Sequence, residues 1–326
     1  MILILSRSVS ETSTNKVIDY LINKNAPFFR FNGDDFINEK LKINFYFDEI
    51  SSKWKFEIST DEIQINSDSI SVVWFRRDFF DELEKLSDES VINTFLKNEI
   101  KQAYNLISLS LDNVLWINRP NEMKHKLHVL QLANIADLSI PYSFVTNNLN
   151  YLEKIIGHES LLITKPLNEG IGIVKDNKKL TTFTSIVDIK KIREEITEFM
   201  IPSFFQSLID KEYEIRTFFF FGKCYSISIF SQNDNKTKID FRDYNIDNPN
   251  RMSRYKLPEN IERKVNKLMN KLKINSGSID FIRDKQGRYV FLEVNPVGQF
   301  DFLEIQGNYS LSKIIAKKLM KINEKN

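Results

Sequence analysis

Three oxygen-bearing side chains near the C-terminus have the types and the spacing of a magnesium site. Residues 276–296 read as two strands around a turn, and Glu293 and Asn295, two residues apart, point to one face of the second strand. If residues 285–288 form the loop, Asp280 lies opposite Glu293. Two carboxylates and an amide carbonyl are the hard ligands that Mg²⁺ prefers, and buried carboxylates are costly unless they are paired or metal-bound. We predict that these three residues hold Mg²⁺; a hairpin with its polar face in water is the alternative.

Two lysines and two glycines earlier in the chain have features of a phosphate site. Lys165 ends an apolar strand, and Pro166 stops that strand, which holds the ammonium near a rim. Gly170 and Gly172 follow, and glycines let backbone N–H groups approach a phosphate, so this stretch is predicted to be a lid; a simple β-turn is the alternative. Lys126 opens a predicted helix, where a cation is unfavourable unless an anion binds; a solvated lysine is the alternative.

A third group of candidates lies between these two. Residues 204–209 form an apolar strand that leaves toward a polar turn, and its extended backbone is suited to an adenine edge. Glu214 is placed to accept ribose hydroxyls, and Arg216 to hold a phosphate or a substrate carboxylate by two parallel hydrogen bonds. A cross-strand salt bridge is the alternative for Glu214 and Arg216. The polar stretch 233–255 is our prediction for peptide contact.

The elements that position these residues belong to an α/β (α+β) protein. Residues 1–5 read as a buried strand, Thr12, Ser13 or Thr14 as a helix N-cap, and residues 26–31 as a second strand. This βαβ opening is typical of an open α/β sheet, and no GxGxxG run follows its first strand. The same patterns predict strands at 43–47, 54–58, 72–75, 161–164, 204–207, 214–221, 278–283 and 289–295, and helices at 91–109, 126–133, 187–198, 259–272 and 310–322.

Composition excludes several classes of protein. A chain of 326 residues is long enough for two or three subdomains, and its formal net charge of +2 gives no reason to expect a nucleic-acid partner. The one cysteine, Cys224, excludes an intramolecular disulfide and a cysteine-based zinc cluster, and we expect it to be inert. No apolar run is long enough for a signal peptide or a membrane span, so a cytoplasmic enzyme is predicted.

Taken together and in this order, these elements resemble the ATP-grasp superfamily. The segments that carry the likeness are 126–147, 163–172, 204–216 and 277–300. The resemblance implies an N-terminal pre-ATP-grasp α/β domain over 1–117, a central subdomain with the lid loop over 118–203, and a C-terminal subdomain that binds nucleotide and metal over 204–326. It implies ATP and Mg²⁺ as cofactors. By position, the phosphates would meet Lys126, Lys165, Gly170 and Gly172, adenine would meet Gln206, Ser207 and Ile209, ribose would meet Glu214, and Mg²⁺ would meet Asp280, Glu293 and Asn295.

Within the superfamily the chain resembles the graspetide synthetases, which crosslink side chains of a ribosomally made precursor peptide. The run Val-Val-Trp-Phe-Arg-Arg at 72–77, the run Trp-Ile-Asn-Arg-Pro at 116–120 and the run Asn-Pro-Val-Gly-Gln-Phe at 295–300 carry this likeness. Ser207 and Leu208 depart from it, because the family often has an acidic–aromatic pair there, and the lid is short. The likeness implies a precursor partner with a leader and a core rich in Ser or Thr and Asp or Glu, and a homodimer.

The reaction that follows is ADP-forming ligation. A precursor Asp or Glu carboxylate would become an acyl phosphate, and a Ser or Thr hydroxyl would then give an ester, or a Lys amine an amide. Lys165 and Arg216 are the candidate catalytic residues, because they would neutralise charge on the phosphoryl oxygens. His125, His128 and His158 fall in no assignable motif, and no residue declares itself as the base. The alternatives are a ligase that adds an amino acid to a peptide or protein terminus, and a non-catalytic nucleotide-binding module.

Overall fold

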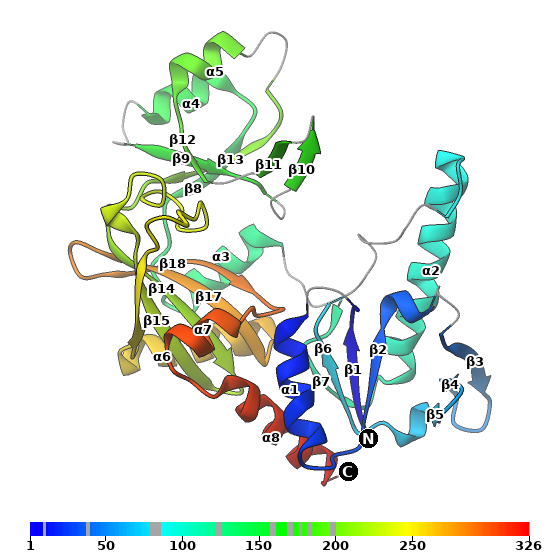
Figure 1. Ribbon diagram of the computed structural model, residues 1–326. Helices are drawn as coiled ribbons and strands as arrows, with labels where there is room; N and C mark the ends of the chain where they lie inside the picture. The colour runs from blue at the N-terminus through cyan, green and yellow to red at the C-terminus, as the bar shows by residue number, and fades with distance from the viewer. Residues whose placement is uncertain are drawn as a thin grey trace. The chain divides into compact units, whose positions relative to one another are not determined.

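The computed structural model describes residues 1–8, 11–36, 40–77, 86–120, 125–156, 161–167, 172–175, 178–181, 184–195 and 200–325 (Figure 1). Its contacts divide the chain into two compact units. The first unit comprises residues 1–123, 296–304 and 310–326, and the second comprises residues 124–295 and 305–309. The three-part division expected from the sequence stays a prediction. None of the helices within the described ranges combines the length and the apolar composition needed to cross a bilayer.

The first unit is built on a parallel sheet with strand order β2–β1–β6–β7 and a smaller antiparallel sheet with order β3–β4–β5. The strands are β1 (Ile2–Ser6), β2 (Phe28–Asn32), β3 (Lys42–Asp48), β4 (Lys53–Ser59), β5 (Gln64–Asn66), β6 (Val72–Phe75) and β7 (Leu115–Ile117). The helices are α1 (Thr12–Ile22), α2 (Ser90–Ser110) and α8 (Leu311–Asn323), with α7 (Asp301–Gln306) at the junction of the units and short 3₁₀ turns η1 (Gly33–Phe36) and η2 (Ser67–Ser69).

Alternation along the parallel strands explains how this sheet is covered. Successive residues of a strand point to opposite faces, so Leu3 and Leu5 share one face with Val73 and Phe75. These four belong to a buried cluster that also takes in residues of α2 and β4. Helix α8 contacts β1 and β6, and α1 and α8 lie side by side (Figure 1). The βαβ opening predicted from the sequence is therefore confirmed.

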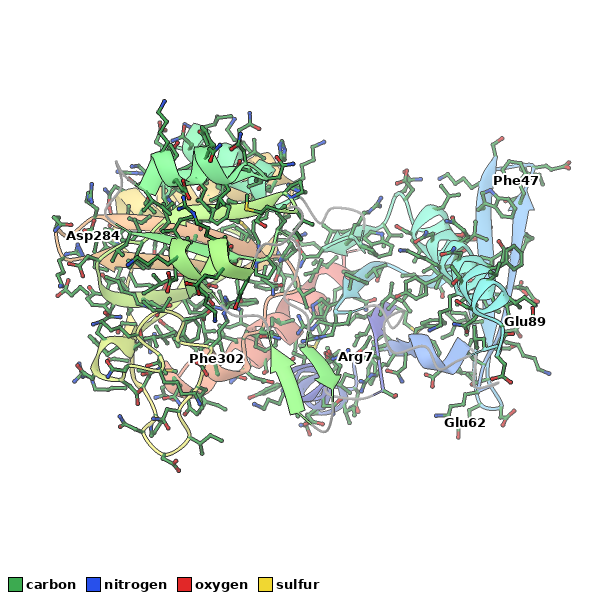
Figure 2. All side chains as sticks on the ribbon, turned by 90° about the horizontal axis from the view of Figure 1, so that it is seen from above. Arg7, Phe47, Glu62, Glu89, Asp284 and Phe302 are labelled. Atoms are coloured by element: carbon green, nitrogen blue, oxygen red, sulfur yellow. The ribbon has the colours of Figure 1, made fainter. Side chains whose placement is uncertain are left out.

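One departure from the expected details has a local cause. Helix α1 begins at Thr12, and its N-cap is Glu11 rather than Thr12, Ser13 or Thr14. Thr14 instead donates its hydroxyl to the Glu11 carboxylate at 2.5 Å. On the β3–β4 hairpin, which was predicted, Phe47 is half exposed and packs edge-on against Trp54 with ring centroids 5.8 Å apart (Figure 2).

A buried guanidinium fixes the segment that re-enters the first unit after residue 295. Arg76, which follows β6, is 2% exposed, and its Nη1 donates to the carbonyl of Val297 at 2.6 Å. The guanidinium also lies 5.1 Å from the ring centroid of Trp74 and 5.3 Å from that of Phe300. Burial lowers the pKa of Arg76 to about 10. The Asn118 amide donates to the carbonyl of Pro296. The runs at 72–77 and 116–120, which carried part of the family resemblance, thus hold the third run, at 295–300, in place.

The second unit contains a sheet of order β12–β9–β13–β8, a hairpin β10–β11 and a larger antiparallel sheet of order β16–β15–β14–β17–β18. Its strands are β8 (Ser143–Thr146), β9 (Leu162–Lys165), β10 (Gly172–Lys175), β11 (Lys178–Thr181), β12 (Ser185–Ile186), β13 (Ser203–Ser207), β14 (Lys211–Phe220), β15 (Lys223–Phe230), β16 (Arg251–Tyr255), β17 (Ser276–Asp284) and β18 (Tyr289–Asn295). Its helices are α3 (Lys126–Ile135), α4 (Leu149–Ile156), α5 (Ile189–Glu195) and α6 (Glu259–Leu272), with a 3₁₀ turn η5 (Ser231–Asn233).

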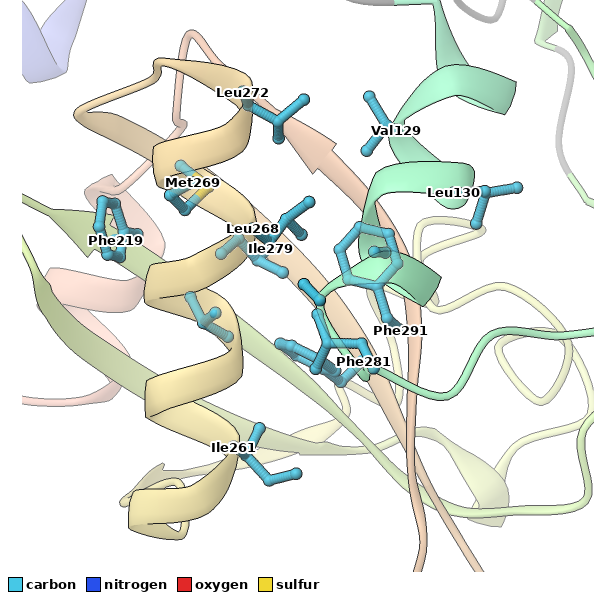
Figure 3. Close-up of a cluster of buried hydrophobic side chains, with 14 of the residues drawn as sticks. Val129, Leu130, Phe219, Ile261, Leu268, Met269, Leu272, Ile279, Phe281 and Phe291 are labelled. Atoms are coloured by element: carbon cyan, nitrogen blue, oxygen red, sulfur yellow. The ribbon is translucent and has the colours of Figure 1, made fainter.

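The larger sheet is held from one side by α3 and α6. Apolar side chains of both helices meet those of β14, β17 and β18 in one cluster (Figure 3). Phe281 and Phe291, both fully buried, pack edge-on in it with ring centroids 5.8 Å apart. Burying a side chain of this size stabilises the fold by about 2–3 kcal/mol. Because strand residues alternate, this packing turns Asp280 to the opposite face of the sheet.

Candidate active site

A cavity with about 660 Å³ of empty space lies within the second unit, on the face of the larger sheet away from α3 and α6. Its walls come from the ends of β9 and β13, the start of β14, the loop after η5, and the polar faces of β17 and β18. The charged and amide side chains that line it are Lys165, Gln206, Lys211, Glu214, Asp240, Arg242, Asp280 and Glu293.

Two carboxylates face each other across the β17–β18 hairpin. Asp280 is the register partner of Glu293, and Asn295 is the partner of Ser278. The turn is formed by residues 285–288, and the predicted pairing of Asp280 with Glu293 is confirmed, although it is reached through a register shift between Asp280 and Phe281. Asp280 is 9% exposed, and burial raises the pKa of its carboxyl group.

A cation accompanies each carboxylate of this pair. Arg216 lies opposite Asp280 on β14 and donates to its Oδ2, while Arg242 Nη1 lies 3.8 Å from Glu293 Oε1. The described residues contain no group of three or more His, Cys, Asp or Glu side chains that could hold a metal. The candidate set is smaller, with two carboxylates and an amide, and its oxygen donors fit Mg²⁺, which keeps several waters and substrate oxygens in its coordination shell. The metal role of Asp280, Glu293 and Asn295 stays a prediction.

The two candidate lysines approach one stretch of backbone. Lys165 ends β9 and lines the cavity, with its Nζ 5.7 Å from the ring centroid of Phe204. Lys126 opens α3, as predicted, and its Nζ donates to the carbonyl of Pro166, the residue after Lys165, at 2.8 Å. Burial lowers the pKa of Lys165 to about 8, with Glu293 opposing and Lys126 adding to the shift. Two ammonium groups at one site indicate an anionic ligand.

The end of β13 offers an unfilled acceptor. Gln206 is fully buried, and its Nε2 donates to Ser143 Oγ at 2.8 Å. Its Oε1 has no hydrogen-bond donor within the part of the chain that the structure describes. Buried acceptors are rarely left unpaired, and an exocyclic amino group such as that of adenine is a donor of the missing kind. The N–H of Ser207 is already engaged with the carbonyl of Tyr142 at 3.0 Å.

Glu214 takes part in a buried ion pair, though with a partner that the sequence did not reveal. Lys211 Nζ donates to Glu214 Oε1, and Ser231 Oγ donates to the same oxygen at 2.8 Å. Burial raises the pKa of Glu214, which these two donors oppose. The alternative of a cross-strand salt bridge is therefore confirmed for Arg216, which pairs with Asp280 on β17. Glu214 pairs instead with Lys211 of its own strand.

Asp240 and Arg242 are site residues that the sequence did not single out. Arg242 donates to the Asp240 carboxylate through Nε at 2.8 Å and through Nη2 at 2.7 Å. Burial would raise the pKa of Asp240, but the hydrogen bonds from Arg242 bring it down to about 2. Both residues belong to the polar stretch predicted to contact peptide. The signal that could have found them is the Asp-Phe-Arg run itself, since this spacing lets a guanidinium fold back onto a carboxylate.

Some predicted residues do not line this cavity. Among the described residues, Lys126, Arg216 and Asn295 lie beside its walls rather than in them. Gly170 lies outside the described residues, and Gly172 begins β10 of the β10–β11 hairpin. The role of that hairpin as a lid stays a prediction.

Two residues set aside at the sequence level have structural explanations. His125 is the N-cap of α3, where its Nδ1 accepts from the N–H of Leu127 at 3.3 Å. Cys224 lies on β15, and burial raises the pKa of its thiol to about 12, which makes it a poor nucleophile. Neither residue lines the cavity.

Comparison with known proteins shows what this chain is similar to. A family model described as the MvdD pre-ATP grasp domain matches residues 1–124. Over 98% of this chain and 96% of the other, the structure is similar to that of a RiPP-associated ATP-grasp ligase from Chryseobacterium gregarium solved with ADP and a leader and core peptide, at 26% identity and a TM-score of 0.86. Residues 1–124 thus match a pre-ATP-grasp domain, and the chain over nearly its full length is similar to ATP-grasp ligases of the graspetide type.

Two macrocyclases from Microcystis aeruginosa MRC also have structures similar to that of this chain. MdnC, solved with its precursor peptide MdnA, matches at 25% identity over 98% of this chain and 99% of its own, with a TM-score of 0.79. MdnB matches in fold at 23% identity over 98% of both chains, with a TM-score of 0.76. No curated protein sequence matches the chain.

Proposed function

We propose that this ligase uses Mg–ATP to activate Asp or Glu side chains of a ribosomally made precursor peptide and joins them to Ser or Thr hydroxyls, or to Lys amines, of the same peptide. The observation that carries the proposal is the cavity, in which a lysine, a buried glutamate and a pair of facing carboxylates line one space. The likeness to ligases solved with leader and core peptides supports a peptide substrate.

The nucleotide is assigned along the cavity from Gln206 to Lys165. The unfilled Oε1 of Gln206 would accept from adenine, and Glu214 would accept from the ribose. Lys165, with Lys126 beside it, would hold the phosphates. Asp280, Glu293 and Asn295 would hold Mg²⁺, which neutralises charge on the phosphate oxygens. Arg216 would keep the buried Asp280 ionised and oriented.

Two transfers then give the product. A carboxylate oxygen of the peptide attacks the γ-phosphorus of ATP, and the bond from that phosphorus to the β–γ bridging oxygen breaks. ADP departs, and the peptide carboxyl group is now an acyl phosphate. A hydroxyl or amine attacks the acyl carbon, its proton is lost, and phosphate leaves, so each ring costs the peptide one water. The Arg242 guanidinium, half exposed beside Glu293, has the charge and position to bind the acyl phosphate or the carboxylate that precedes it.

We further propose a precursor whose core contains Ser or Thr and Asp or Glu, a homodimer, and action in the cytoplasm, where ATP is available. Light scattering on the purified protein measures the oligomer.

When one peptide is held at both of its reacting side chains, the second transfer becomes effectively unimolecular.

Mass spectrometry of precursor peptides encoded beside this gene tests the reaction. After incubation with enzyme, Mg²⁺ and ATP, we expect a loss of one water per ring, and no loss with the Asp280→Ala/Glu293→Ala variant. Mild alkali opens esters and leaves amides. A gain of the mass of an amino acid would point instead to the terminal-addition ligase, and ATP binding without any mass change would sink the proposed substrate.

A further inference from the structure

Lys211 links two parts of the cavity wall that have different tasks in the proposed chemistry. The residue is 5% exposed, and its ammonium donates both to Glu214 Oε1 and to the carbonyl of Ile239, the latter at 3.1 Å. Glu214 is the residue assigned to the ribose, whereas Ile239 immediately precedes Asp240. One buried cation therefore joins the ribose carboxylate to the loop that carries Asp240.

A β-bulge makes this link possible. Residues three apart in a regular strand point to opposite faces, so Lys211 and Glu214 should not meet. The register of β14 against β17 shifts between Lys211 and Tyr213. Bulges re-aim side chains next to functional sites, and here the shift turns Lys211 toward the cavity side of the sheet.

Glu214 keeps one oxygen for a ligand. Oε1 accepts from both Lys211 and Ser231, and within the described ranges Oε2 has no recorded donor. Glu214 lines the cavity. A ribose hydroxyl that donates to Oε2 would hold the carboxylate in one orientation without displacing Lys211, because the two use different oxygens.

Residues 231–243, here termed the lysine-linked loop, connect this carboxylate to the other end of the cavity. Within the loop, Thr237 Oγ1 donates to the carbonyl of Ser231 at 3.0 Å. Asp240 accepts from the N–H of Thr184 at 3.2 Å and from Arg242. Arg242 in turn lies 3.8 Å from Glu293. Asp240 and Arg242 thus depend on the position of residue 239, which Lys211 holds.

We propose that Lys211 is a positioning residue that transmits ribose binding at Glu214 to the lysine-linked loop, so that the Asp240–Arg242 pair is held in place when a ribonucleotide fills the cavity. The inference rests on the proposed assignment of ATP to this cavity. If the loop opens, the bond from Lys211 to Ile239 breaks. With the carboxylate fixed by ribose, the ammonium has less freedom to follow, so nucleotide binding raises the free energy of opening.

Hydrogen exchange measured by mass spectrometry tests this link without a precursor peptide. The protein is compared free, with saturating Mg–ATP, and with saturating Mg–2′,3′-dideoxyATP, which lacks both ribose hydroxyls. We expect both nucleotides to slow exchange at residues 206–210. Only ATP should slow the lysine-linked loop, by about fivefold or more, the lower end of ordinary coupling between sites.

Variants separate the link from general stability. In Lys211→Met, ATP should still slow exchange at 206–210 but leave the loop unchanged. Lys223→Met, the same substitution at an exposed lysine of β15, should behave as wild type. Ser231→Ala removes the other donor to Glu214 and keeps the Ile239 bond, so loop protection at saturation should persist.

Protection of the loop by dideoxyATP equal to that by ATP would overturn the proposal, as would full protection in Lys211→Met. If Lys211→Met does not fold, the comparison of ATP with dideoxyATP on the wild-type protein still tests the proposal. Absence of protection at 206–210 with either nucleotide would instead overturn the nucleotide assignment, and the proposal with it.

Discussion

If Lys165 holds the phosphates of ATP as proposed, its depressed pKa should make ATP binding depend on pH in a range where few side chains titrate. Burial brings this pKa from its ordinary 10.5 to about 8. At pH 7 about nine-tenths of the free protein carries the ammonium, and at pH 9 about one-tenth does. Because the triphosphate would bind the charged form of Lys165, the affinity for ATP should fall as pH rises, by about tenfold between pH 7 and pH 9.

The same reasoning predicts proton uptake. Bound phosphates raise the pKa of Lys165 again, so at pH 9 each ATP bound should bring about 0.9 proton, and at pH 7 about 0.1. Titration calorimetry with Mg–ATP in buffers of different ionisation enthalpy measures both quantities. Lys165→Arg stays charged over this range and is the matched control, because the titration of ATP itself is common to both proteins. Equal affinity at pH 7 and pH 9, with no proton uptake beyond that of Lys165→Arg, would refute the reasoning.

Four further substitutions test other parts of the structure. Arg76→Met removes the donor from several buried acceptors and should lower the free energy of unfolding by about 3–5 kcal/mol in denaturant titrations; a change below about 1 kcal/mol would contradict the packing described. Lys211→Leu and Glu214→Leu should each cost about 3–5 kcal/mol, because each leaves a buried charge unpaired, whereas the double variant should cost clearly less than the sum; additivity in a double-mutant cycle would contradict the ion pair. Arg242→Lys keeps the charge and loses the planar fork, so peptide-stimulated ADP release should fall about tenfold or more while ATP affinity is unchanged; a loss of ATP affinity instead would assign Arg242 to the nucleotide.

Local patterns sufficed for much of the fold because each element buries one face. Strand β6 spans residues 72–75, helix α6 residues 259–272 and strand β18 residues 289–295, as predicted. The facing of Asp280 and Glu293 was predicted from the sequence, but a β-bulge is also needed for it. Next to the loop Arg283 pairs with Tyr289, and a register shift between Asp280 and Phe281 brings Glu293 opposite Asp280.

The parts of the site that were missed depend on distant contacts or on irregular backbone. Lys211 meets Glu214 only through a β-bulge, which strand periodicity does not anticipate. Asp240 reaches the cavity from a loop and contacts Thr184, which lies 56 residues away in the chain. The strand-like run around Cys224 is strand β15, in which Ser226 and Ser228 are buried although they are polar.

The fate of a carboxylate oxygen tests the central claim most directly. A precursor peptide whose Asp and Glu carboxyl groups carry ¹⁸O is incubated with the ligase and Mg–ATP, and the released phosphate is analysed by mass spectrometry. Activation as an acyl phosphate predicts one ¹⁸O atom in phosphate for every water that the peptide loses. Loss of water with phosphate that carries no ¹⁸O would contradict the account.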